Sequence, residues 1–253
     1  MNLCPIMDYK NILVGIGNPL LYITANVDKQ FIQNHRLEEN GSMLVTKKRM
    51  DELIDEILNS QSDPNIEYTP GGTILNTVRI FQWTMNRIVN NDNKPITHFA
   101  TFFGAIGNDD YSEILLSESQ KSGLRMLCQK IEDEHTDEYR AFANEMNFDK
   151  IEDIKDIGLE MAKFEKVSSL NERVIVITRD DLPLIVIKND GQMIEYKVKE
   201  IPNGTLVDSS CAGDAFAGGF IAAYVCGFKL EQCIEQGCSA AEMIIQRRGC
   251  KLD

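Results

Sequence analysis

Short apolar runs that end in glycine or in a polar turn recur along the chain, and each predicts a buried strand. The first is 11–17 (Asn-Ile-Leu-Val-Gly-Ile-Gly), and the next is 98–106 (His-Phe-Ala-Thr-Phe-Phe-Gly-Ala-Ile). A later run at 172–178 has the same character, and residues 20–27 alternate loosely enough to predict a further strand. Continuous apolar runs of this length are typical of strands buried on both faces of a parallel sheet.

Between these runs, apolar residues recur at the three- to four-residue spacing of an amphipathic helix. This spacing predicts helices at 47–58, 74–89 and 230–247. A further helix is expected at 111–122, because Asp109 can accept hydrogen bonds from its first amides and a glycine follows its last turn. Strands that alternate with helices favour an α/β fold with a mostly parallel sheet and right-handed crossovers.

The alternation fails in the middle of the chain. Leu124 to Cys128 predicts the start of a strand, but the charged segment 129–135 that follows has no buried-strand character. The pattern then predicts two successive helices, 136–147 and 151–167. We therefore expect the strands on either side of this segment to lie far apart, with little sheet between them.

A β-hairpin is predicted after this break. Two apolar alternating runs, 183–188 and 193–198, flank the dipeptide Asp190-Gly191. Asp-Gly is a preferred pair in the tight turns whose twist matches that of the flanking strands. This part of the chain is therefore expected to form antiparallel strands.

The starts of two helices carry the candidate chemistry. Pro70-Gly71-Gly72-Thr73 precedes one helix, and Asp208-Ser-Ser-Cys-Ala-Gly-Asp214 precedes the apolar run 215–225. The first amides of a helix have no internal partner, so together with the helix dipole they form a site for an anion such as phosphate. Asp214 then lies where a carboxylate can accept a proton from a hydroxyl that faces the anion. The alternatives are a plain Gly-Gly loop and a helix capped by Asp208 or Ser210.

Composition narrows the class of protein. The chain has 253 residues, of which 43% are hydrophobic and 26% charged, as in ordinary globular proteins. A net charge of -13 argues against a nucleic-acid partner, although local amides can still bind ATP. The seven cysteines show neither disulfide-motif nor zinc spacing, which indicates reduced thiols. No signal peptide or membrane span is recognised, so we expect a cytoplasmic location, with the nucleus as an alternative. The expected oligomeric state is a monomer.

Several stretches occur in the order found in one known family. Together they resemble the ribokinase-like (PfkB) sugar and nucleoside kinases, and within them the adenosine kinases. The resemblance covers about residues 10–126 and 135–253. The matching stretches are Gly15 to Leu21, Gly71-Gly72-Thr73 with Asn76, Thr101 to Gly107, Asp208 to Asp214 with Gly218-Gly219, and Arg247 to Cys250.

The resemblance implies a fold and a reaction. The fold would be a ribokinase-like, mostly parallel sheet flanked by helices, in a single domain over residues 1–253. Residues of about 20–48 would form a small β lid, and a family segment would be missing between 126 and 135, so that the central part is deleted. The reaction would be ATP-dependent phosphorylation of adenosine at the ribose 5′-hydroxyl, giving AMP.

The resemblance also implies roles for individual residues. Asp214 would accept the proton of the 5′-hydroxyl. The other residues fall into three groups: an anion hole formed by amides of Cys211, Ala212 and Gly213; a substrate site formed by Asn18, Tyr22, Gly71, Gly72, Thr73 and Asn76; and Glu138, which would help to organise Mg²⁺. The expected small molecules are adenosine, ATP as co-substrate and Mg²⁺, with no nucleic acid and no membrane.

Three departures from the family pattern leave other functions open. Tyr22 stands where adenosine kinases have an aspartate that binds the ribose hydroxyls, and Cys211 replaces a glycine of the anion hole. If that position requires a positive φ, cysteine would be strained by about 1–3 kcal/mol. With the missing segment, these changes also fit a catalytically inactive pseudokinase, or a truncated isoform with a binding or regulatory role. Another sugar kinase of the same superfamily is a third hypothesis.

Overall fold

The computed structural model describes most of the chain. The described residues are 12–37, 45–60, 66–89, 98–131, 159, 162, 174–179, 182–188, 190–199, 201 and 204–252. Their strands form three separate sheets, which are parallel in one case and antiparallel in the other two.

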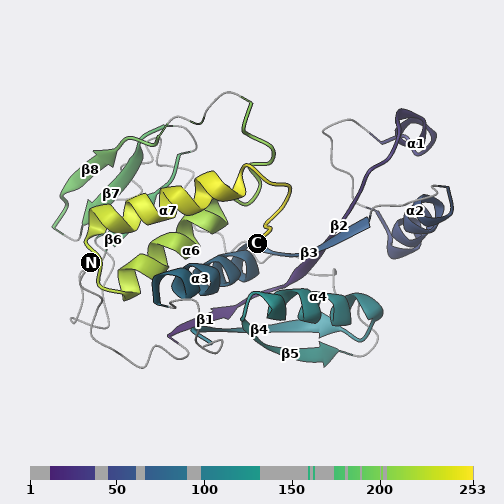
Figure 1. The fold of residues 1–253 in the computed structure, drawn as a ribbon, viewed down its shortest axis with the longest axis horizontal. Coiled ribbons are helices and arrows are strands. Elements are labelled where there is room, and N and C mark those ends of the chain that lie inside the picture. The colour runs from purple at the N-terminus through teal and green to yellow at the C-terminus, as the bar shows by residue number, and fades with distance from the viewer. Residues whose placement is uncertain are drawn as a thin grey trace.

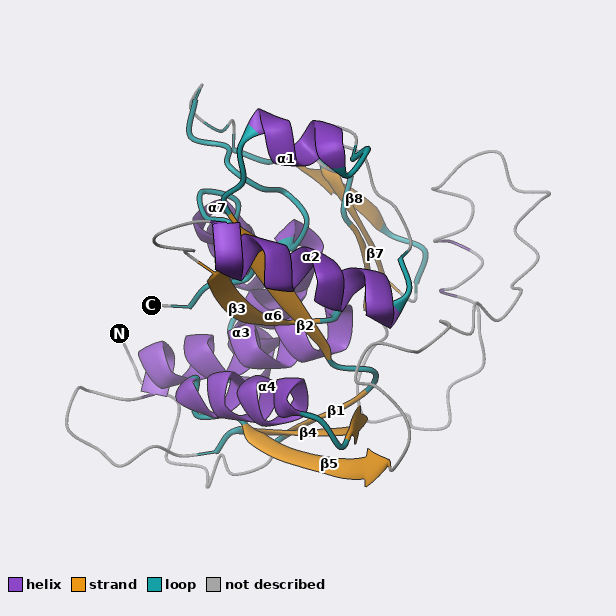
Figure 2. Cartoon of the chain, turned by 90° about the vertical axis from the view of Figure 1, so that its right-hand side faces the viewer, coloured by secondary structure: helices purple, strands orange, loops and turns teal. Residues whose placement is uncertain are grey.

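The parallel sheet has the strand order β1-β4-β5, formed by β1 (Leu13–Ile16), β4 (Ala100–Gly107) and β5 (Arg125–Ile131). Two helices lie on one side of this sheet, α3 (Thr73–Val89) and α4 (Asp110–Lys121) (Figures 1 and 2). This is the arrangement expected when successive strands are joined by right-handed crossovers in one direction. The alternating strands and helices predicted for this part of the chain are confirmed.

The main core lies between the parallel sheet and these helices. Phe81 from α3, Phe102 from β4 and Leu115 from α4 are fully buried in it. At the start of α4, Asp109 accepts a hydrogen bond from the amide of Ser112 at 2.8 Å, as predicted. The helix is followed by a glycine with a positive φ of 79°, a backbone conformation that glycine adopts without strain.

The opposite face of the parallel sheet is open. The register aligns Ile16 with Phe103 and Phe103 with Leu127, so these three apolar side chains form a row across it. Ile16 is 75% exposed, and Phe103 and Leu127 are each 40% exposed. No described helix covers this face in either view (Figures 1 and 2). Parallel sheets normally have helices on both faces. This sheet therefore buries less apolar surface than a parallel sheet that is covered on both sides.

The two faces of β4 allow a direct test of this arrangement. Phe102→Ala should lower the free energy of unfolding by about 3–5 kcal/mol, because it leaves a cavity in the core. Phe103→Ala should cost only about 1–1.5 kcal/mol, because its side chain is already 40% exposed. Urea denaturation of both variants measures the difference. Equal losses would mean that Phe103 is covered in solution.

A second sheet joins β2 (Leu20–Ala25) to β3 (Ile66–Gly71) in antiparallel register. Helices α1 (Lys29–Asn34) and α2 (Lys47–Ser60) lie beyond its far end, to one side of the molecule in Figure 1. The strand predicted at 20–27 and the helix predicted at 47–58 are confirmed. The lid function expected for residues 20–48 stays a prediction, and 38–44 lie outside the described residues.

The third sheet is antiparallel, formed by β6 (Val174–Ile177), β7 (Leu184–Lys188) and β8 (Met193–Tyr196). The hairpin predicted at Asp190-Gly191 is confirmed, and Gly191 has a φ of 82°. Apolar residues of β7 pack against those of the two C-terminal helices, in a cluster that contains Leu184, Val186, Phe216 and Ile234.

The prediction for the middle of the chain was partly wrong. Residues 129–131 belong to β5, where Gln129 pairs with Ala105 and Ile131 with Gly107. Their polar character misled the prediction because β5 is an edge strand whose outer face is exposed. Strands β5 and β6 do lie in different sheets, as expected. Of the two helices predicted at 136–167, only Leu159 and Ala162 are described, and both are helical.

Helix α6 (Ala212–Val225) lies between α3 and α7 (Leu230–Ile244), and glycines let the three approach closely. A Cβ at Gly218 would lie 2.7 Å from the Thr77 carbonyl oxygen of α3. A Cβ at Gly219 would lie 2.8 Å from the Gln236 carbonyl oxygen of α7. This packing fixes where the start of α6 lies. None of the described helices is long and apolar enough to cross a membrane.

Alanine substitutions at two glycines of α6, Gly218 and Gly213, should change the stability of the protein in opposite directions. Gly218→Ala should destabilise the protein by about 1–3 kcal/mol, because the added methyl group overpacks the contact with α3. Gly213→Ala should instead stabilise it by about 0.5–1 kcal/mol, because nothing lies within 4 Å of its added Cβ. Thermal denaturation of the two variants checks the signs. A stabilising Gly218→Ala would contradict the close packing.

Candidate active site

Asp214 lies in the first turn of α6, where the backbone of Cys211 forms the N-cap. No side chain caps this helix, so the alternative of a cap by Asp208 or Ser210 is wrong. Asp208 instead accepts hydrogen bonds from the amides of Ser210 and Gly249, each at 2.9 Å. The hydroxyl of Ser210 also donates to Asp208. This hydrogen bond has the largest effect, and together with the two amide bonds it lowers the pKa of the Asp208 carboxyl. The start of α6 therefore has no side-chain cap.

Asn76 connects the two helix starts that carry the candidate chemistry. Its side-chain Nδ2 donates to Oδ2 of Asp214 at 3.0 Å and to Sγ of Cys211 at 3.5 Å. Burial raises the pKa of the Asp214 carboxyl, and the hydrogen bond from Asn76 opposes this effect. A half-buried carboxylate with a raised pKa, held in one orientation by an amide, is suited to accept a proton.

The Gly71-Gly72 turn joins β3 to α3 beside this pair. Gly72 has a φ of 93°, and a Cβ there would lie 2.6 Å from the carbonyl oxygen of Asn18. The turn therefore needs glycine both for its backbone conformation and for the close approach of Asn18. The carbonyl of Gly72 accepts the amide of Asn76 at 2.8 Å, so the turn also sets the position of Asn76. Thr73 is the first residue of α3 and is exposed.

Tyr22 occupies the space next to this turn. It lies on β2 opposite Thr69, and its ring is so close to Gly71 that a Cβ there would be 2.4 Å from Cε2 of the tyrosine. Burial raises the pKa of the Tyr22 phenol, a hydrogen bond with the Gly72 backbone lowers it, and Asp214 is among the acids that raise it. The phenol is therefore a neutral group close to the Asp214 carboxylate.

The amides predicted to form an anion hole differ in availability. The amide of Ala212 donates to the carbonyl of Ser209 at 3.1 Å, so it is already engaged. Gly213 is exposed, with open space where a side chain would be. Cys211 has a φ of -108°, which any residue adopts. The strain considered for cysteine at this position is therefore absent.

Arg79 is a buried charge near the site that the sequence interpretation missed. Its Nη1 donates to the carbonyl oxygens of Pro70 at 3.0 Å and Cys250 at 3.3 Å. Burial lowers the pKa of its guanidinium. These bonds join the end of β3 to the segment after α7. An arginine between Val78 and Ile80 in the helix at 74–89 was the signal available in the sequence.

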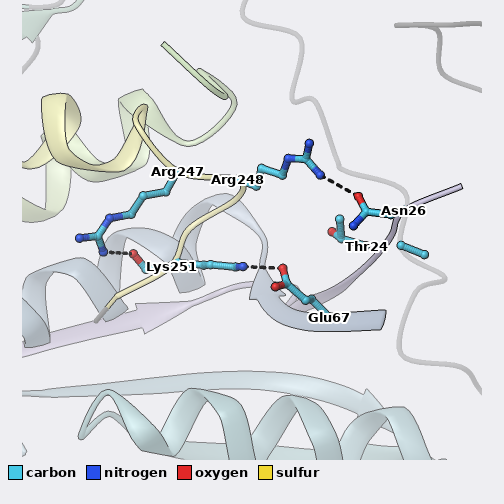
Figure 3. Close-up of a pocket in the computed structure, with 7 residues that line it drawn as sticks. Thr24, Asn26, Glu67, Arg247, Arg248 and Lys251 are labelled. Carbon is cyan, nitrogen blue, oxygen red and sulfur yellow. Dashed lines mark hydrogen bonds and ion pairs between the residues drawn. The ribbon is translucent and has the colours of Figure 1, made fainter. Parts of the chain in front are cut away.

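A basic pocket of about 270 Å³ lies between the β2–β3 sheet and the segment after α7 (Figure 3). Arg248 donates to Oδ1 of Asn26 at 3.2 Å, and Lys251 pairs with Glu67. Arg247 donates to the carbonyl of Lys251 at 3.0 Å. Asp214 does not line this pocket. The polar contacts within the pocket therefore connect the β2–β3 sheet to the segment after α7.

The structure thus brings most of the predicted site residues together. Gly72 lies close to Asn18, the Tyr22 side chain lies against Gly71 and Gly72, and Asn76 reaches Asp214 and Cys211. Glu138, predicted to organise Mg²⁺, lies outside the described residues. Within the described ranges, no group of three or more His, Cys, Asp or Glu side chains is arranged to hold a metal.

The chain is similar to known kinases. Residues 138–253 match the model of the pfkB family carbohydrate kinases. Adenosine kinase 1 of Arabidopsis thaliana is 25% identical over 345 residues, and the match covers 96% of each chain. That alignment is 92 residues longer than the 253-residue chain, so the relative has internal residues without a counterpart here.

Solved structures show the same fold. Adenosine kinase from Anopheles gambiae, in complex with P1,P4-di(adenosine-5) tetraphosphate, has a TM-score of 0.70 and 22% identity, covering 95% of this chain and 97% of that one. The apo adenosine kinase from Trypanosoma brucei brucei has a TM-score of 0.73 and 21% identity, covering 93% and 98%. The expected ribokinase-like α/β fold is confirmed, and residues 138–253 are similar to the pfkB family of carbohydrate kinases.

Proposed function

We propose that the chain transfers the γ-phosphate of ATP to the 5′-hydroxyl of adenosine, giving AMP and ADP. The observation that carries this proposal is the pairing of Asn76 with Asp214 at the start of α6, next to the Gly71-Gly72 turn. It joins a candidate base, a helix terminus for an anion and a backbone turn for a ribose. The relatives named above are adenosine kinases, which supports adenosine as the acceptor.

Asp214 acts as the base in this proposal. The hydroxyl of the ribose donates its proton to the carboxylate while the oxygen attacks phosphorus. The raised pKa of Asp214 makes the carboxylate a better proton acceptor than an exposed aspartate. Asn76 donates to Oδ2, which leaves Oδ1 for the substrate hydroxyl.

Phosphoryl transfer depends mainly on positioning and charge neutralisation, which the start of α6 supplies. Of the three predicted anion-hole amides, those of Cys211 and Gly213 would be left to bind the phosphate, because the amide of Ala212 is bonded to Ser209. ATP would bring Mg²⁺ on its phosphates, where the ion would neutralise charge. The role of Glu138 in organising this ion stays a prediction.

The acceptor ribose would lie against Asn18 and the Gly71-Gly72 turn. The absence of side chains at the two glycines lets the sugar approach the backbone closely. Thr73 and Tyr22 would border the same space, with the exposed threonine hydroxyl available to a sugar hydroxyl. The phenol of Tyr22 offers one hydrogen bond where a carboxylate would accept two.

A binding assay paired with an activity assay tests the proposal against the alternatives. We expect the purified chain to bind ATP and adenosine in calorimetry and to form AMP above the level of a protein-free control. Binding of both without AMP would favour the pseudokinase hypothesis, which Tyr22 motivates. Phosphorylation of a sugar in preference to adenosine, in a substrate panel with ATP, would assign the chain to another branch of the superfamily.

A further inference from the structure

Two cysteines meet at the start of α6. Cys211 is 2% exposed and Cys250 is 0% exposed, and both belong to one buried cluster that also contains Ile80 and Ile244. Both are free thiols. Cys250 lies in the segment after α7, far from Cys211 in the sequence. This pair is separate from the catalytic role of Asp214 and has no part in the proposed transfer of phosphate beyond the Cys211 amide.

The chain segments that carry the two cysteines are already bonded to each other. The amides of Val207 and Asp208 donate to the carbonyl of Ile245 at 2.8 and 3.1 Å. The amide of Gly249 donates to Oδ2 of Asp208 at 2.9 Å. Arg79 bonds the carbonyl of Cys250 from the other side. A covalent bond between the two sulfurs would therefore join backbone segments that are held side by side.

The surroundings of Cys211 favour its thiolate. It is the N-cap of α6, where the helix dipole stabilises negative charge, and Asn76 donates to its Sγ at 3.5 Å. A hydrogen bond from the thiol of Cys250 is the main reason that the pKa of Cys211 is lowered, and the charge of Arg79 acts in the same direction. The same hydrogen bond, together with burial, raises the pKa of Cys250. One sulfur is thus prepared to attack, and the other remains a thiol next to it.

We propose that Cys211 and Cys250 form a reversible disulfide when the protein meets a peroxide. The Cys211 thiolate attacks one oxygen of hydrogen peroxide, so a sulfur–oxygen bond forms, the oxygen–oxygen bond breaks, and hydroxide leaves as water after taking a proton. Cys250 then attacks the sulfur of the resulting sulfenic acid and releases a second water. Two thiols and one peroxide give one disulfide and two waters, with two electrons passing from sulfur to oxygen. A dithiol reductant reverses the change.

The disulfide would alter the proposed active site. It would remove the Cys211 thiolate, which accepts a hydrogen bond from Asn76, the residue that holds Asp214. Phosphoryl transfer should then fall, and return on reduction. This consequence rests on the proposed function, whereas formation of the bond does not.

Mass spectrometry of the full chain tests the bond. The reduced protein is treated with hydrogen peroxide, alkylated and digested without reductant. We expect a linked peptide pair containing Cys211 and Cys250, lighter by two hydrogens than the two thiol peptides, which disappears after treatment with dithiothreitol. It should form before oxidation of Cys128 and Cys238, whose pKa values are raised by burial. The linked protein should also melt at a higher temperature than the reduced protein.

Two variants make the test specific. In Cys250→Ser, sulfenic acid at Cys211 trapped by dimedone should rise at least about tenfold, because no second thiol resolves it. Cys238→Ser should leave the linked peptide unchanged and serves as the matched control. Oxidation of Cys128 or Cys238 with no link between 211 and 250 would overturn the proposal, even if Cys250→Ser failed to fold. A linked but inactive protein whose reduced form is also inactive would refute the kinase function and not the bond.

Discussion

Replacing Asp214 by asparagine is expected to lower the rate of AMP formation by about 10²- to 10⁴-fold, the usual contribution of a general base. Asn76 can still donate to the side-chain oxygen of an asparagine at this position, so the local packing should be preserved. The measurement is kcat with saturating ATP and adenosine. A matched control is Asp208→Asn, because Asp208 accepts hydrogen bonds from the amides of Ser210 and Gly249, whereas Asp214 accepts one from Asn76.

The same substitution should not weaken the fold. Burial raises the pKa of Asp214, so its charged form is disfavoured in the folded protein. Stability at neutral pH is therefore reduced by this carboxylate and increases as the pH falls toward its raised pKa. Asp214→Asn should melt at the same temperature as the wild type or higher at pH 7. A large loss of thermal stability would mean that any loss of activity reflects unfolding, and the proposed role of Asp214 would lose its support.

Replacing Tyr22 by aspartate is expected to raise the affinity for adenosine by about 10- to 150-fold. A carboxylate accepts two hydrogen bonds from the ribose hydroxyls, and hydrogen bonds to a charged group contribute about 1.5–3 kcal/mol. The substitution also removes the ring that lies against Gly71. Calorimetry with adenosine measures the change.

Two controls separate charge from space. Tyr22→Phe keeps the ring without its hydroxyl and should show no gain. Tyr22→Ala removes the ring without adding a charge, so any gain it shows reports the cleared space alone. If Tyr22→Asp binds adenosine no better than Tyr22→Ala, the ribose does not reach this position. The added carboxylate should also raise the pKa of Asp214 further, because the phenol of Tyr22 already interacts with that group.

Local signals in the sequence were sufficient for much of the fold. Asp190-Gly191 predicted a hairpin because few dipeptides fit so tight a turn, and Asp109 predicted a helix start because its side chain satisfies free amides. Residues 129–131 were missed because an edge strand with an exposed face carries polar residues that resemble a loop. The spacing of apolar residues shows which face of an element is buried. This signal is weak in a segment that has no buried face.

In the candidate site, too, some features could be predicted from the sequence and others could not. The two helix starts were recognised from glycines and an aspartate, but the contact between Asn76 and Asp214 depends on how α3 packs against α6. The ring of Tyr22 against Gly71, and the meeting of Cys211 with Cys250, also depend on tertiary packing between distant segments. No local pattern predicts such contacts. The location of the absent family segment between 126 and 135 stays a prediction.

The pH dependence of AMP formation shows whether the Asp214 carboxylate takes part in the reaction. The rate should fall as the pH decreases through the raised pKa of Asp214, because protonation removes the base. This acid-side decrease should begin at a higher pH than for an ordinary aspartate, and Asp214→Asn should show a low rate without it. A wild-type rate equal to that of Asp214→Asn across the whole range would contradict the account, because the carboxylate at the start of α6 would then have no part in the reaction.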